Sequence, residues 1–157
     1  MFKPMEIVLA TVDDIPQLLP LLDILFSQEG EFQPDHTVQR QGLEMIIRGD
    51  DLGDVFVAKH TGSVVGMVTL LYTVSTALGG KVALLEDMIV SPEFRDSGVG
   101  RAMLGHAQKH AGNVGCKRIT LLSDSDNIHA HRFYERYGFR CSTMQPFRKL
   151  LVGKDNE

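Results

Sequence analysis

The middle of the chain contains three closely spaced runs of β-branched and aliphatic residues, at Val55–Lys59, Ser63–Val74 and Val82–Val90. Runs of this composition are typical of β-strands. Only His60-Thr-Gly62 separates the first two, and a turn at Gly79-Gly80 separates the second from the third. Because such short connections join antiparallel neighbours, the sequence predicts an antiparallel meander.

Two helices are predicted between a short first strand at Met5–Thr11 and this meander. The first follows a cap with acidic residues and carries apolar residues at helical spacing to about Gln28, and Pro20 is expected to kink or interrupt it. The second covers Thr37–Arg48. The side chains of this second helix expected to face inward are Val38, Met45 and Ile46.

Shorter elements are predicted after the meander. A helix opens at Gly98-Val-Gly100, a compact strand follows at Ile119–Leu122, and another helix covers Asp126–Tyr137. Two short strands are expected within Gly138–Leu151, on either side of Pro146. The last helix and these strands complete the predicted elements.

This order of elements predicts an α/β (α+β) fold. We expect a mixed, mostly antiparallel central sheet of about six to seven strands, flanked by about four helices, because strands and helices do not alternate as in a Rossmann fold. A chain of 157 residues has the size of one domain, so residues 1–157 are expected to form a single domain.

The distribution of charge and apolar residues excludes several classes of protein. Residues 1–60 carry 4 basic and 11 acidic side chains and the remainder 12 basic and 9 acidic, which disfavours a nucleic-acid-binding protein. The longest nearly apolar stretch, Val64–Val74, is shorter than the ~20 residues of a membrane span. With only two cysteines, Cys116 and Cys141, and no apolar leader, a cytoplasmic location is expected.

A glycine-rich turn, Arg95-Asp-Ser-Gly98-Val-Gly100, lies between the last meander strand and the following helix. Backbone N–H groups and the positive end of a helix bind phosphate at such places, and Arg95 and Arg101 add positive charge. The Lys-Ser/Thr of a P-loop and the dinucleotide fingerprint are both absent. An ordinary strand-to-helix turn is the alternative interpretation.

The sequence Met88-Ile-Val90-Ser-Pro92-Glu-Phe-Arg95-Asp-Ser-Gly98-Val-Gly100 resembles motif A of the GNAT superfamily of N-acetyltransferases. About 30 residues further on, Asn127-Ile-His-Ala130-His-Arg-Phe133-Tyr134-Glu-Arg-Tyr-Gly138-Phe139 resembles motif B of the same family. Both motifs stand in the family's order and spacing. Asp96-Ser97 replaces the family's frequent Gly-Lys, and Asp96 is expected to point to solvent.

The resemblance implies acetyl-CoA as the acyl-donor cosubstrate. The end of the motif A strand would hydrogen-bond the pantetheine arm, and the following turn would hold the pyrophosphate. Asn127 would bind the pantetheine or order the neighbouring loop, and Tyr134 would lie near the thioester sulfur. The strand residues are Met88, Ile89 and Val90, and the turn residues are Arg95, Asp96, Ser97, Gly98, Val99, Gly100 and Arg101.

Transfer of an acetyl group to an amine requires two proton transfers. An amine with a pKa near ~10.4 is mostly protonated at neutral pH, so a general base must accept its proton, and the departing thiolate needs a general acid. Glu86 is the preferred base, Asp87 the alternative, and Tyr134 the acid. Period-2 alternation puts Leu84, Glu86 and Met88 on one face of the strand and Asp87 on the other, and one carboxylate should face the amine.

The family resemblance also indicates where the acceptor binds. The expected acceptor is a primary amine of a small molecule or peptide, bounded by the segment Phe26–Thr37 with its acidic Glu29, Glu31 and Asp35, and by the turn near Ser75–Gly80. Many members dimerise, so a homodimer is one option. A non-catalytic domain that binds acetyl-CoA as a sensor or regulator remains the alternative function.

No metal site is predicted from the sequence. His106 and His110 are four residues apart on a predicted helix, but the glutamate of a zinc motif and a third ligand are missing. A solvated helix face is the favoured interpretation of this pair.

Overall fold

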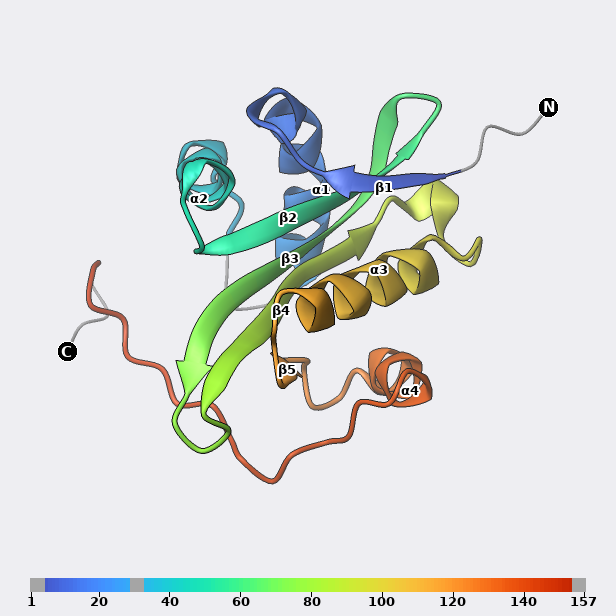
Figure 1. The fold of residues 1–157 in the computed structure, drawn as a ribbon. Helices are drawn as coiled ribbons and strands as arrows, with labels where there is room; N and C mark the ends of the chain where they lie inside the picture. Colours follow the sequence, from blue (N-terminus) through green and yellow to red (C-terminus); the bar gives the residue numbers. More distant parts are fainter. Residues whose placement is uncertain (1–4, 29–32, 154–157) are drawn as a thin grey trace. The chain divides into compact units, whose positions relative to one another are not determined.

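The computed structural model describes residues 5–28 and 33–153 (Figure 1). The chain divides into two compact units, Met1–Leu122 and Ser123–Glu157, and each is described by itself.

The first unit is built on a five-stranded sheet (Figure 1). Its strands follow one another in space in chain order, and the first four are antiparallel. The last strand runs parallel to its neighbour. The predicted meander is therefore confirmed. The strands are β1 (Glu6–Leu9), β2 (Gly53–His60), β3 (Ser63–Ser75), β4 (Gly80–Val90) and β5 (Ile119–Leu121).

The turn between β2 and β3 shows why the meander forms at this point of the chain. His60 pairs with Ser63, which leaves Thr61 and Gly62 as a two-residue loop with φ angles of 48° and 84°. Two consecutive positive φ angles are those of a type I′ turn, whose twist matches that of antiparallel strands. Gly62 adopts its angle without the strain that a Cβ atom causes.

The helices agree with the predicted order. In the first unit they are η1 (Val12–Asp14), α1 (Ile15–Gln28), α2 (His36–Arg48), η2 (Pro92–Phe94) and α3 (Val99–Asn113), and in the second unit α4 (Ile128–Arg136). Helix α1 continues through Pro20, so of the two expected effects, a kink or an interruption, the interruption does not occur. Pro20 would deprive the Pro16 carbonyl of its partner, but both residues are exposed, so water can bind that group.

Helices pack on both faces of the sheet. Side chains of α1 and α2 form one core cluster with Val55, Val57, Met67 and Ile89 of the strands. The alternate side chains of β2 and β3, such as Phe56, lie on the other face, which α3 covers. The buried residues of α3 are Val99, Met103, Leu104, Ala107 and Ala111.

The buried face of α2 differs from the prediction. Val38 and Met45, expected to face inward, are 61% and 67% exposed, whereas Gln39 and Leu43 are buried. Asp35 caps the helix by accepting hydrogen bonds from the backbone N–H groups of Thr37 and Val38. The helix therefore begins at His36. Its core-facing side is the one that carries Leu43, Ile46 and Ile47, which pack together in the core cluster. The third predicted residue, Ile46, is half-buried and packs against the core, as expected.

The second unit contains α4 and an aromatic cluster. Ring centroids of Phe133 lie 5.3 Å from Tyr134 and 5.1 Å from Tyr137, and Tyr134 lies 5.7 Å from Phe139. No described residue from 137 to 153 belongs to a strand, so the two short strands expected around Pro146 are wrong. Proline cannot donate a backbone hydrogen bond to a sheet. The fold class is confirmed, with five strands in the described residues rather than six to seven.

Candidate active site

Strand β4 contains a β-bulge in its second half. Two of its residues, Asp87 and Met88, lie opposite a single residue of β3, and the register shifts by one at this point. Asp87 has a φ angle of 53°, which a residue with a side chain adopts only in special local structure. Bulges of this kind bend a strand and redirect its side chains.

The bulge changes which side chains share a face of the sheet. Glu86 pairs with Thr69 on one side of the bulge, and Ile89 pairs with Met67 on the other. Because directly paired residues share a face, Glu86 and Ile89 both lie on the face covered by α1 and α2. The alternation expected to carry Met88 onto the face of Glu86 is therefore wrong.

The two candidate carboxylates on β4 have different surroundings. Glu86 is exposed, and among the described residues its carboxylate makes no hydrogen bond or ion pair. Asp87 is half-buried and engaged in an interaction. Thr69, the cross-strand partner of Glu86, is 1% exposed, and its hydroxyl has no partner in the described part of the chain. Of the two carboxylates, Glu86 and Asp87, it is Glu86 that has no partner in the described residues and is available to accept a proton.

The loop from β4 to α3 is held by local hydrogen bonds. The backbone N–H of Ser91 donates to the Val65 carbonyl at 2.8 Å, and Nε of Arg95 donates to the Val90 carbonyl at 3.3 Å. The hydroxyl of Ser97 donates to the Phe94 carbonyl. These contacts fix the course of the loop across the end of the sheet.

The loop ends at Gly98, which is the N-cap of α3 and has a φ angle of 89°. No side chain caps this helix. The first intrahelical bond runs from the Ala102 N–H to the Gly98 carbonyl, so the N–H groups of the residues between them have no acceptor within the helix. A Cβ atom at position 98 would meet nothing within 4 Å. This helix end is open to an anionic ligand.

Charged side chains surround this helix end. Arg95, Asp96 and Arg101 are all exposed. Asp96 has a φ angle of 60°, which aspartate tolerates better than most residues. The unpaired N–H groups and the helix dipole favour a phosphate group at this position, and Arg95 and Arg101 add positive charge to the same stretch of chain, partly offset by Asp96.

Polar residues of α1 and α2 lie on the side where the acceptor was expected. Nε2 of His36 lies 2.6 Å from Oδ2 of Asp23, and Nε2 of Gln39 donates to Oδ1 of the same carboxylate at 3.4 Å. The buried Oε1 of Gln39 has no partner among the described residues. Asp35 serves as the cap of α2. The other two acidic residues expected here, Glu29 and Glu31, lie outside the described residues.

A second polar cluster, formed by Asp54, Tyr72 and His110, was not predicted from the sequence. Oδ2 of Asp54 accepts a hydrogen bond from the Tyr72 hydroxyl at 2.5 Å and lies 2.9 Å from Nε2 of His110. Burial, together with this hydrogen bond, raises the pKa of Tyr72. His106 and His110 also pack edge-on against Phe56, so His110 is not simply part of a solvated helix face. The partners of His110 lie on other elements, and its spacing from His106 does not reveal them.

The motif B residues belong to the second unit. Asn127 caps α4 by accepting a hydrogen bond from the Ala130 N–H at 3.1 Å, so its side chain orders the start of this helix. Partial burial raises the pKa of Tyr134, which therefore keeps its proton over a wider pH range than a solvated phenol. Among the described residues the Tyr134 hydroxyl makes no hydrogen bond, so its proton is available.

The described residues contain no group of three or more His, Cys, Asp or Glu side chains arranged to hold a metal ion. None of the helices within residues 5–28 and 33–153 is both long and apolar enough to span a membrane.

The bulged strand β4 leads through a glycine-rich loop to the open end of α3, where backbone N–H groups can bind a phosphate group. Residues 18–139 match the acetyltransferase (GNAT) family, so the chain belongs to this family of N-acetyltransferases. The match includes the second half of β4, the loop, α3 and the motif B helix.

Similar proteins agree with this assignment. The uncharacterized N-acetyltransferase YhfO of Bacillus subtilis is 28% identical over 142 residues, which span 88% of this chain and 92% of YhfO. The glucosamine 6-phosphate N-acetyltransferase of Trypanosoma brucei brucei is 32% identical over 58% of this chain and 60% of that enzyme. A possible acetyltransferase from Clostridium difficile 630 has the same fold, with a TM-score of 0.85, 17% identity and coverage of 96% of this chain and 100% of its own.

Replacing Gly98 tests the role of the loop. We expect Gly98→Ala to weaken acetyl-CoA binding about five- to thirty-fold, because the loop of the free variant would relax out of the left-handed conformation, and restoring it with a Cβ atom present costs about 1–2 kcal/mol. Isothermal titration calorimetry measures this change. Gly105→Ala is the matched control, since Gly105 lies on the exposed side of α3, has no positive φ angle and leaves open space for a Cβ atom. Equal affinity in the two variants would contradict the assignment.

Proposed function

We propose that this enzyme transfers the acetyl group of acetyl-CoA to a primary amine of a small molecule or peptide, by direct attack of the amine in a ternary complex. The proposal includes both units, residues 1–157, as one catalytic domain. The observation that carries it is the open N-terminus of α3 after Gly98, directly downstream of the bulged strand with its unengaged carboxylate. Membership of the acetyltransferase (GNAT) family supports it.

The cosubstrate would be held by β4 and the loop that follows it. The backbone of Met88–Val90 would hydrogen-bond the pantetheine arm as an added strand does, and the amides of Arg95–Arg101 would hold the pyrophosphate. The unpaired N–H groups at the start of α3 and the empty space beside Gly98 support the second assignment. Bound in this way, acetyl-CoA supplies the activated acyl group, so the protein needs no nucleophile of its own.

The general base would be Glu86. An amine with a pKa near ~10.4 must be deprotonated before it can attack. At neutral pH this deprotonation costs about 4–5 kcal/mol, and a nearby carboxylate can accept the proton. The exposed, unengaged carboxylate of Glu86 supports this role. Asp87 is the second candidate, and its existing interaction makes it less available.

The general acid would be Tyr134, which donates its proton to the departing CoA thiolate. Burial raises the pKa of this phenol, so the proton needed for the step is present at neutral and moderately alkaline pH. Asn127 would contribute by ordering the start of the helix that carries Tyr134, as its capping hydrogen bond indicates.

The acceptor class and the location of the enzyme are inferred from less direct observations. The relative named as a glucosamine 6-phosphate N-acetyltransferase supports a small molecule with a primary amine as acceptor. The partly exposed Asp23 carboxylate is a hydrogen-bond acceptor suited to an amine. The two free cysteines are in keeping with a cytoplasmic location.

A panel of amines tests the function as a whole. The enzyme is mixed with acetyl-CoA and amino sugars, aminoalkyl acids, polyamines or peptides, and release of free CoA is followed with a thiol reagent. We expect amine-dependent release for at least one class, with the acetylated product confirmed by mass spectrometry. Tight acetyl-CoA binding without amine-dependent release from any class would instead support a non-catalytic sensor.

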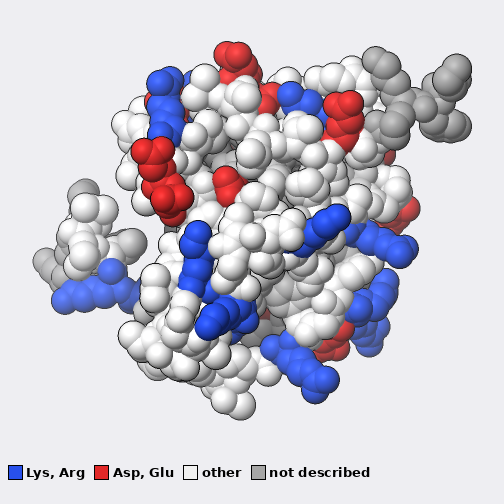
Figure 2. Space-filling view, viewed as in Figure 1, with Lys and Arg blue, Asp and Glu red and all other residues white. Residues whose placement is uncertain are grey.

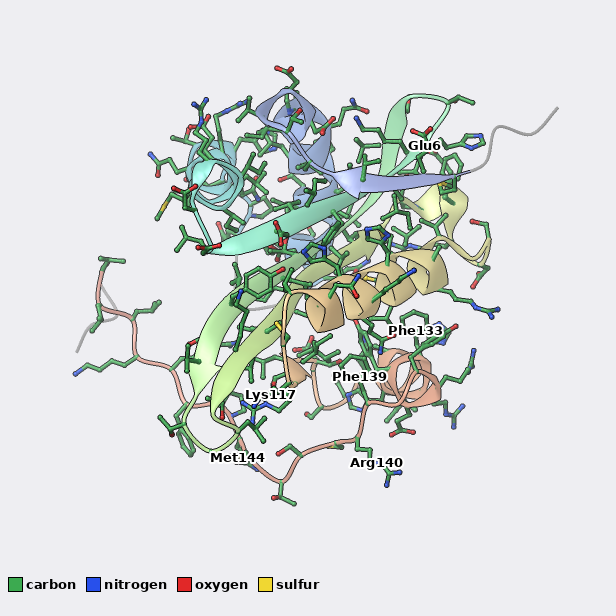
Figure 3. The ribbon with its side chains drawn as sticks, in the orientation of Figure 1. Glu6, Lys117, Phe133, Phe139, Arg140 and Met144 are labelled. Carbon is green, nitrogen blue, oxygen red and sulfur yellow. The ribbon has the colours of Figure 1, made fainter. Side chains whose placement is uncertain are left out.

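Replacing the proposed base separates catalysis from binding. We expect Glu86→Gln to lower kcat at neutral pH by about 10²–10⁴-fold, with little change in acetyl-CoA affinity. The loss should shrink as pH rises toward the pKa of the amine, because the amine then deprotonates without help. Glu6→Gln changes another exposed strand glutamate, on β1 (Figure 3), and should keep full activity. A collapse of activity in Asp87→Asn alone would transfer the role to Asp87.

Replacing the proposed acid gives a second kinetic test. Tyr134→Phe removes only the hydroxyl and should lower kcat by about 10²-fold or more without raising the KM for acetyl-CoA. Because burial raises the pKa of Tyr134, any fall of wild-type kcat from its ionisation should appear at a higher pH than for a solvated tyrosine. Tyr137→Phe, on the same unit, is the control. Full kcat in Tyr134→Phe with an intact fold would contradict the role.

A further inference from the structure

The hydroxyl of Thr69 is a buried polar group at the centre of the sheet. Thr69 stands in the middle of β3 and is 1% exposed, and within the described part of the chain its Oγ1 has no hydrogen-bond partner. A buried hydroxyl without a partner costs free energy that a valine of nearly the same shape would not. This cost indicates that the hydroxyl has a partner when the enzyme works.

The neighbours of Thr69 on its face of the sheet are apolar, with one exception. Val55 of β2 lies opposite Thr69 on one side, and Glu86 of β4 lies opposite it on the other. Along β3 the next residues on the same face are Met67 and Leu71. Directly opposite residues have Cβ atoms about 4.5–5.5 Å apart, within reach of a long side chain. Of these four neighbours, Glu86 is the one whose side chain contains oxygen atoms.

The pairing of the strands leaves Thr69 as the cross-strand neighbour of Glu86. The bulge at Asp87 and Met88 begins directly after Glu86, so the Glu86–Thr69 pair is the last regular pair before it. On the other side of β4, β5 pairs only with residues 83–85. Within the described sheet, any cross-strand support for the Glu86 side chain therefore comes from Thr69.

A basic side chain is the other usual partner of a carboxylate, and the helix nearest to β4 on this face provides none. Helix α1 packs against β4 and contains no lysine, arginine or histidine. Residues 1–60 carry 11 acidic and only 4 basic side chains, and Figure 2 shows acidic side chains over the region where α1, α2 and β1 lie. A hydroxyl group can orient a carboxylate in such surroundings without neutralising its charge.

We propose that Thr69 is a positioning residue, whose hydroxyl donates a hydrogen bond to the Glu86 carboxylate when the acceptor amine is bound. The proposal rests on the role of Glu86 as general base. In the structure the Glu86 side chain is exposed, and catalytic hydrogen bonds of this kind often tighten only in the complex with substrate. The amine proton passes to an oxygen of Glu86, while Thr69 keeps its own proton.

This pair joins a rigid donor to a flexible base. Threonine is branched at Cβ, which restricts its χ1 angle, and burial in the core holds Thr69 further. A glutamate side chain is flexible and must lose rotamer freedom to stay in one place. Because a catalytic group displaced by about 1 Å can slow a reaction about 100-fold, fixing the carboxylate affects the chemical step more than substrate binding.

Replacing Thr69 tests the proposal, with the panel amine that gives the fastest release of CoA as acceptor. Thr69→Val removes the hydroxyl and should lower kcat about 5- to 50-fold at neutral pH, with the KM for acetyl-CoA unchanged. Its Tm should be equal to that of the wild type or higher, because the buried hydroxyl is gone. Thr69→Ser keeps the hydroxyl and should restore kcat, although it removes a methyl group from the core.

Thr73→Val is the matched control for these variants. Thr73 belongs to the same strand but is exposed, so this variant should keep full activity. A merely structural role of Thr69 predicts the opposite order, in which Thr69→Ser is the more impaired variant and Thr69→Val retains kcat. That order would overturn the proposal.

A double-mutant cycle separates this proposal from the base assignment on which it rests. In a Glu86→Gln background, Thr69→Val should change kcat by less than about twofold, because the carboxylate through which Thr69 acts is absent. An equal loss in both backgrounds would overturn the positioning role, as would full kcat in Thr69→Val when Glu86→Gln is impaired. Full kcat in Glu86→Gln, or no turnover with any amine of the panel, would overturn the base assignment and this proposal together.

Discussion

The bulge in β4 is the constraint on which the arrangement of the proposed site depends. Without the extra residue at Asp87 and Met88, strict alternation would put Glu86 and Ile89 on opposite faces. The bulge instead allows Glu86 to lie on the face of α1 and α2 while Ile89 packs into the core on that same face. It also alters the course of the strand just before the loop that leads to α3. One inserted residue thus determines both the face of the sheet on which the Glu86 carboxylate lies and the path of the chain toward the start of α3.

The fold supports this region with rigid elements. Helix α3 is anchored along its length by buried Met103, Leu104 and Ala107, and near its C-terminus His110 is tied to Asp54 of β2. Its N-terminus, by contrast, has no side-chain cap and begins at a left-handed glycine. A helix held firmly at one end and left open at the other can present its N–H groups to an anion without the cost of ordering them. The packing of α3 on the sheet thus holds its unpaired N–H groups in place for a ligand.

Much of this arrangement follows from sequence patterns that act locally. The two-residue turn that contains Gly62 and the loop that ends at Gly98 both require a residue with a positive φ angle, which glycine adopts readily. The meander and the loop before α3 were therefore predictable. The bulge was not, because the run from Ala83 to Val90 contains no signal that distinguishes an extra residue from regular alternation. The buried face of α2 is set by packing of Leu43, Ile46 and Ile47 against the core, and Val38 and Met45 lie off that face. The contacts of Asp54 with Tyr72 and His110 join residues 18 and 56 positions apart, beyond the reach of any local pattern.

We propose that the end of β4 and the loop to α3 form the acetyl-CoA site. Titration of ¹⁵N-labelled protein with acetyl-CoA, followed residue by residue in ¹H–¹⁵N correlation spectra, can test this site. The largest shifts should appear at the amides of residues 88–90 and 95–101. Unchanged amides in these two ranges, together with saturable shifts elsewhere, for example along the outer face of α2, would contradict it.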